Sequence, residues 1–109
     1  MTLTGKIEAV SSVSSGFSQY TGNPWKSCSL VLVCTETVQG QEVKNRFLLH
    51  CKDDVCDSVQ QIVKEHTDGN GEIDGVYTCT CFSHVRDVQT KDGRSFRSQD
   101  FNCFKVERV

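Results

Sequence analysis

Apolar and polar side chains alternate along much of the chain, which is the pattern of half-buried β-strands. Residues 3–9 alternate in this way. They predict a first strand, and Gly5 within it indicates a bend or a close backbone approach. Residues 25–36 include four successive apolar positions, 30–33. A strand covered on both faces has this pattern, so we expect a central second strand there. Residues 42–51 alternate again and predict a third strand.

One segment has helical periodicity instead. Residues 54–66 carry an apolar stripe at the spacing i, i+4, i+7 and i+8. The stripe is formed by Val55, Val59, Ile62 and Val63. We expect a helix over this segment, capped by Asp53 or Asp54 and ended by the two glycines of residues 68–71.

Two further strands complete the pattern. Residues 75–85 are rich in β-branched and aromatic side chains, and residues 94–107 follow a hairpin turn at 90–93 that contains the favoured pair Asp-Gly. The order β-β-β-α-β-β, within a single domain of residues 1–109, predicts a mainly β fold. We expect a five-stranded oligonucleotide/oligosaccharide-binding (OB) barrel with one α-helix between strands 3 and 4. An SH3-like barrel and a β-grasp sheet are the alternatives.

The chain is weakly acidic overall, but its charges are unevenly distributed. The chain carries a formal charge of −2, and residues 52–74 alone carry −5, which leaves +3 for the rest. A mildly basic remainder suits weak, salt-sensitive binding to a phosphate backbone. No apolar run is long enough to cross a membrane, so we expect no membrane partner.

Seven cysteines are an odd number without the regular spacing of a disulfide framework. Several fall inside strand segments, where cysteine packs as a small apolar residue. We therefore expect reduced thiols and a cytoplasmic protein, with a secreted, disulfide-bonded domain as the alternative. The pair Cys79 and Cys81, joined by Cys51 and Cys56, lacks the two matched pairs typical of structural zinc. We therefore expect no metal, and we expect no cofactor. We also expect no catalytic residues, because His50, His66 and His84 accompany no catalytic motif.

Several short motifs are spread over nearly the whole chain. They are Gly5-Lys6-Ile7, Ser15-Gly16, Gly22-Asn23, Trp25-Lys26, and Asp100 with Phe104-Lys105-Val106. Together they resemble a small bacterial family of domains of unknown function that is similar to single-stranded DNA-binding proteins. Residues 44–52 also resemble the third strand of those binding proteins. Lys44 and His50 depart from the resemblance, because outward positions of that strand typically carry aromatic side chains.

Binding to a single strand requires cations for the phosphates and flat rings for the bases. In an OB barrel the ligand crosses strands two and three, which the loops 11–24 and 87–93 flank here. The candidate rings are Phe17, Tyr20, Trp25 and His50, and the candidate cations are Lys26, Lys44, Arg46, Lys91, Arg94 and Arg97. We expect a non-enzymatic protein that binds single-stranded DNA or RNA with little sequence preference. Packing of Trp25 at the rim of the barrel is the alternative role for that side chain.

The alternative function is a protein–protein interaction module on the same fold that does not bind nucleic acid. Net acidity and few aromatic side chains favour it. In either case the doubly apolar second strand offers Val31 and Val33 as the contact of a homodimer.

Overall fold

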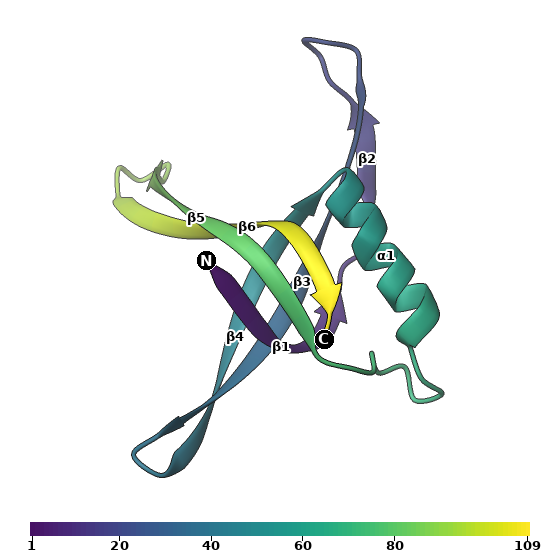
Figure 1. The fold of residues 1–109 in the computed structure, drawn as a ribbon. Coiled ribbons are helices and arrows are strands. Elements are labelled where there is room, and N and C mark those ends of the chain that lie inside the picture. Colours follow the sequence, from purple (N-terminus) through teal and green to yellow (C-terminus); the bar gives the residue numbers. More distant parts are fainter.

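The structure is a computed structural model that describes residues 1–109. It contains six strands and one helix (Figure 1). The elements are β1 (Thr2–Val10), β2 (Ser14–Phe17), β3 (Pro24–Val38), β4 (Gln41–Lys52), α1 (Asp54–His66), β5 (Tyr77–Gln89) and β6 (Ser95–Arg108). The mainly β class and the bounds of the helix are confirmed. The strand count of five is wrong, because the expected loop 11–24 contains β2, and the helix therefore lies between β4 and β5.

Strand β2 escapes prediction because its four residues, Ser-Ser-Gly-Phe, carry no apolar alternation. It forms by pairing with the start of β3, where Ser14 lies opposite Ser27 and Phe17 opposite Pro24. The two strands make a hairpin that projects from the rest of the molecule (Figure 1).

The other five strands pair in a closed cycle, from β1 through β5, β6, β4 and β3 back to β1. All these pairs are antiparallel except β4 with β6, which is parallel over Leu49–Cys51. The return from β3 to β1 brings Gly5 against the backbone of β3. A Cβ on Gly5 would lie 2.1 Å from the Val33 carbonyl oxygen. The close backbone approach predicted at Gly5 is confirmed, and only glycine fits there.

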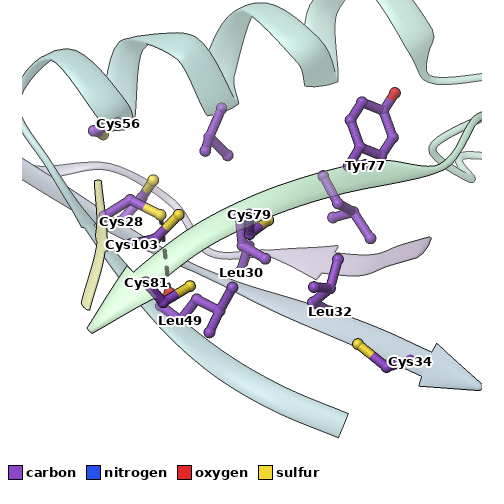
Figure 2. Close-up of a cluster of buried hydrophobic side chains, with 13 residues drawn as sticks. Cys28, Leu30, Leu32, Cys34, Leu49, Cys56, Tyr77, Cys79, Cys81 and Cys103 are labelled. Atoms are coloured by element: carbon purple, nitrogen blue, oxygen red, sulfur yellow. Dashed lines mark hydrogen bonds between the residues drawn. The ribbon is translucent and has the colours of Figure 1, made fainter. Parts of the chain in front are cut away.

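Cysteine side chains line much of the inside of the ring. All seven cysteines are free thiols among the thirteen buried residues of the core (Figure 2). Four of them form one row across neighbouring strands: Cys28 lies opposite Cys51, Cys51 opposite Cys103, and Cys103 opposite Cys81. Their predicted placement as small apolar core residues is confirmed.

The helix contacts β3, β4 and β6. Val59 and Cys56 are fully buried, and Val55 and Ile62 of the apolar stripe pack against the same core. The prediction that an aspartate side chain caps the helix is wrong. Asp53 is the N-cap residue, but its carboxylate accepts a hydrogen bond from the Lys26 backbone N–H at 3.2 Å instead of capping α1. That bond ties the start of the helix to β3.

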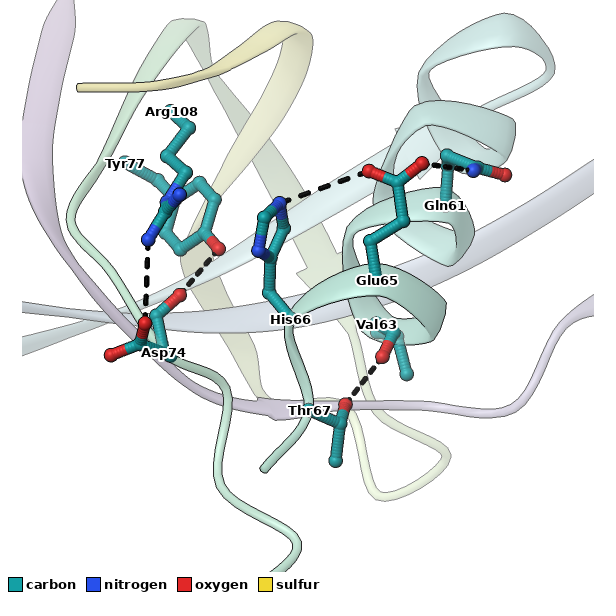
Figure 3. Close-up of polar contacts among 8 residues, drawn as sticks. All are labelled: Gln61, Val63, Glu65, His66, Thr67, Asp74, Tyr77 and Arg108. Atoms are coloured by element: carbon teal, nitrogen blue, oxygen red, sulfur yellow. Dashed lines mark hydrogen bonds and ion pairs between the residues drawn. The ribbon is translucent and has the colours of Figure 1, made fainter. Parts of the chain in front are cut away.

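The segment that follows the helix is tied to β5 and β6 (Figure 3). The hydroxyl of the buried Tyr77 donates to the Asp74 carbonyl at 2.6 Å, and Arg108 pairs with the Asp74 carboxylate at 3.3 Å. The helix spans 13 residues, and the fold has no helix with the length and apolar character needed to span a bilayer.

Candidate nucleic-acid interface

The outer face of β3, β4, β6 and β5 is hollowed by an open groove of about 420 Å³. Its floor is one row of paired residues: Ser29 of β3, His50 of β4 and Asn102 of β6. One wall is the segment between β1 and β2, and the other is the arm formed by β5 and β6. We call it the serine groove, and its polar lining consists of Ser11, Ser12, Ser14, Ser27, Ser29, His50, Lys52, His84, Asp100 and Asn102.

Hydrogen bonds fix one wall of the groove to its floor. The Ser11 hydroxyl accepts from the Ser29 backbone N–H at 2.8 Å, and the Ser11 N–H donates to the Ser29 carbonyl at 2.8 Å. The Ser29 hydroxyl and His50 Nδ1 lie 3.2 Å apart and share a hydrogen bond. The segment between β1 and β2 is therefore held in place where it borders the groove. Hydroxyl, amide and imidazole groups of this kind contact phosphates, sugars and base edges.

The charge in the serine groove is balanced and includes one free cation. Asp100 is paired with Arg86 at 2.8 Å. Lys52 is exposed and takes part in no ion pair. Its ammonium is therefore available to an anionic ligand.

The predicted cations Lys44 and Arg46 lie on β4 but line a different hollow. That hollow is bordered by five carboxylates and three cations. Arg46 holds Glu8 with two hydrogen bonds, from Nε to Oε2 at 2.9 Å and from Nη2 to Oε1 at 3.2 Å. The hydrogen bond from Arg46 keeps the pKa of the Glu8 carboxyl below its usual value. A phosphate must displace Glu8 to reach Arg46, whereas Lys44 is free of ion pairs.

Trp25 and Lys26 lie at the base of the β2–β3 hairpin, beside the start of the helix. The indole lies across Gly16 of β2, where a Cβ would come within 2.9 Å of the ring, and 43% of Trp25 is exposed. Three aspartates border the same hollow, and one of them, Asp57, pairs with Lys26. This hydrogen bond raises the pKa of the Lys26 ammonium. The surroundings of Trp25 therefore carry more negative than positive charge.

The remaining predicted residues lie near the tips of the β2–β3 hairpin and of the β5–β6 arm. Phe17 and Tyr20 are on the β2–β3 hairpin, and Tyr20 is 97% exposed. Lys91 lies in the turn between β5 and β6 and forms no ion pair. Arg94 and Arg97 flank that turn and pair with Asp92 and Asp87 at 3.3 and 3.5 Å.

Of the predicted residues, only His50 lines the serine groove. Lys52, His84 and Asn102, which the structure brings to His50, were not predicted from the sequence as site residues. Neither was Phe82, which lies opposite Asn102. A signal for Phe82 and Asn102 exists: each is adjacent to a buried cysteine, and alternation along a strand places such neighbours on the outside.

All seven thiols are buried in the core, and Cys28 also borders the groove. Burial raises the pKa of Cys81 to about 12, and burial with a hydrogen bond to Cys28 raises the pKa of Cys56 to about 11. These thiols therefore stay protonated near neutral pH, which makes them poor nucleophiles and poor metal ligands. No three His, Cys, Asp or Glu side chains are arranged to hold a metal ion.

Comparison with known proteins supports the fold but not a family. No protein-family model and no curated protein matches the chain. Solved structures that share its fold include small single-stranded DNA-binding proteins from Mycoplasma pneumoniae (TM-score 0.58, 9% identity) and Streptomyces coelicolor (0.52, 12%), and the mitochondrial single-stranded DNA-binding protein from S. cerevisiae (0.54, 11%). The alignments cover 99–100% of this chain and 90–92% of those chains. At such identities the likeness establishes a shared fold over the whole chain.

Proposed function

We propose that this protein binds single-stranded nucleic acid, without catalysis and with little sequence preference, in the serine groove across β3 and β4. The ring of strands is then the OB barrel that the element order predicts. The observation that carries the proposal is the position of the groove. It crosses the second and third strands of the ring and is bordered by residues 11–14, which belong to one of the two segments that flank the ligand of an OB barrel.

Charge supports the choice of this groove over the hollows at Arg46 and at Trp25. The hollow at Lys44 and Arg46 has five carboxylates to three cations, and the hollow at Trp25 has three to one. The serine groove has one of each, and its carboxylate is already neutralised by Arg86. Of these three hollows, the serine groove repels a polyanion least.

The fold comparison supports the class of ligand. Each of the three solved structures compared above is described as a single-stranded DNA-binding protein. We propose that the strand lies on His50 and Lys52 and extends toward the free lysines Lys44 and Lys91 at either side. The hairpin rings Phe17 and Tyr20 are then within the path of a longer strand.

A fluorescence anisotropy titration tests the proposal. The probe is a labelled thymidine oligonucleotide of about 16 nucleotides, the upper site size of one OB fold, at ~50 mM salt. We expect binding that weakens steadily as salt rises, and weaker binding to a duplex of the same length. Absence of binding at ~50 mM salt, where the electrostatic contribution is favoured, contradicts the proposal.

A protein partner is the second candidate, favoured by the acidic hollow at Trp25 and by the ion pairs that occupy Lys26 and Arg46. Val31 and Val33 are half-buried on the outer face of β3, and we propose them as a contact between two copies. Sedimentation equilibrium tests the dimer: a monomeric mass at all concentrations contradicts it.

A further inference from the structure

Two phenylalanines beside the serine groove are packed on each other but not covered by the rest of the chain. Phe82 of β5 and Phe104 of β6 stack with ring centroids 6.1 Å apart and planes inclined by 29°. They are 55% and 54% exposed. The other phenylalanine pair, Phe47 with Phe101, is half-buried and packs on the core. The exposed pair therefore differs from a core contact.

A β-bulge places Phe104 on the outside. Thr80 lies opposite Lys105 and Cys81 opposite Cys103, so Phe104 is one extra residue on β6. A bulge of this kind re-aims a side chain and is frequent next to functional sites. Without it, β5 and β6 would keep one register and Phe104 would have a partner directly opposite. The bulge therefore places the Phe104 ring on the outer face of β6.

The neighbours of the pair are polar, and two of them lack partners. Asn102 lies between Phe82 and His50 in the strand register, and its side-chain amide makes no hydrogen bond within the chain. Lys52 and Phe104 each follow the last pair of the β4–β6 register, Cys51 with Cys103. Flat rings, a free amide and a free ammonium thus lie on neighbouring strands.

This combination fits an unpaired nucleobase and its phosphate. Single-strand binders stack bases on aromatic rings and hold the backbone with cations, and an amide donates to and accepts from base edges. A docked protein would favour an apolar centre with a polar rim. Here the two rings lie at the margin of a polar groove.

We propose that Phe82 and Phe104 form a base-stacking subsite, with Asn102 on the base edge and Lys52 on the adjoining phosphate. The inference rests on the proposed function and adds the residues that recognise bases as distinct from phosphate charge.

The test compares two probes of equal charge, a thymidine oligonucleotide and an abasic oligonucleotide of the same length, by anisotropy at ~50 mM salt. The unmodified chain is expected to prefer the thymidine probe. Replacing both rings, in the F82A/F104A variant, is expected to reduce that preference by about 10-fold to 100-fold, since each stacked base contributes about 1–3 kcal/mol. The abasic probe should bind both proteins alike.

Two control variants show whether the aromatic rings themselves are required. F82L/F104L retains apolar side chains without flat rings and is expected to lose most of the preference, whereas V85A, on the opposite face of β5, is expected to keep it. An unchanged preference in F82A/F104A contradicts the subsite. So does a fall in molecular mass of that variant by sedimentation, which would make the pair a contact between copies. If the unmodified chain binds neither probe, the proposed function itself fails and the subsite fails with it.

Discussion

The inner and outer faces of the same four strands differ at each of four adjacent positions. The pairs of inner and outer residues are Cys28 and Ser29, Cys51 and His50, Cys103 and Asn102, and Cys81 and Phe82. Inside, thiols pack with leucines and need no polar partner. Outside, hydroxyl, imidazole, amide and aromatic groups border a groove. One strand register therefore sets both the core and the candidate site, and a slip by one residue exchanges them.

The largest effect is expected where a side chain is removed from the inner face. Leu49 is fully buried and its neighbour Leu48 is 53% exposed. L49A is expected to lower the free energy of unfolding by about 2–5 kcal/mol, because it loses burial and leaves a cavity. L48A, the matched outer-face control, is expected to change it by less than about 1 kcal/mol. Urea denaturation measures both, and equal costs would contradict the assignment of the two faces.

The pairing of β1 with β3, which closes the ring, is the second feature that a substitution can test. G5A places a Cβ against the Val33 carbonyl, so β1 must move away from β3. We expect a loss of about 1–3 kcal/mol in unfolding free energy, as for other overpacked sites. G69A is the control, because a Cβ there meets no atom within 4 Å. A G5A protein as stable as G69A would show that the ring does not close as described.

The buried thiols predict an alkaline loss of stability. Burial raises the pKa of Cys56 to about 11 and of Cys81 to about 12, from 9 in a solvated thiol. Between pH 9 and 12 the folded chain thus binds more protons than the unfolded chain, and its stability falls as pH rises. Urea midpoints at pH 7 and pH 10 measure the fall, and C81A should reduce it. A flat profile would contradict the burial of these thiols.

The same core predicts a thiol count. In denaturant, seven groups should react with a thiol reagent, as all seven cysteines are free. In the folded chain the reaction should be slow, because each sulfur is buried. A count below seven, or a stoichiometric metal by elemental analysis, would contradict a reduced, metal-free core.

On the outer face, a single unpaired cation should matter more than a paired one. K52A is expected to weaken binding to a thymidine oligonucleotide and to lower the salt slope by about 0.7, one phosphate contact on a single strand. K26A is expected to have the smaller effect, since Asp57 already holds that ammonium. Anisotropy titrations over a range of salt concentrations measure both slopes. A larger effect of K26A would move the binding site to the Trp25 hollow.

The sequence predicts elements whose signal is local. The apolar stripe of 54–66 gives the helix its bounds, and Gly5 marks a close approach because it interrupts an otherwise regular strand. Strand β2 is missed, as its stability comes from pairing with residues 24–27 and not from its own side chains.

The candidate site is predicted only in part, because its residues meet across strands that are distant in sequence. His50 is found from the alternation of β4, but its neighbour Asn102 is set by the parallel pairing of β4 with β6. The engagement of Arg46 by Glu8 likewise joins residues 38 positions apart. Alternation shows which face a side chain occupies, and only the register shows what lies beside it.

The central claim is that the outer face of β3, β4 and β6 binds a single strand. The most direct measurement is the two-dimensional NMR spectrum of the chain while a thymidine oligonucleotide is added. We predict that the largest shifts fall on Ser29, His50 and Asn102, with smaller shifts at Arg46 and Asp57. Shifts concentrated at Arg46 or at the Trp25 hollow, or no shifts at ~50 mM salt, would contradict it.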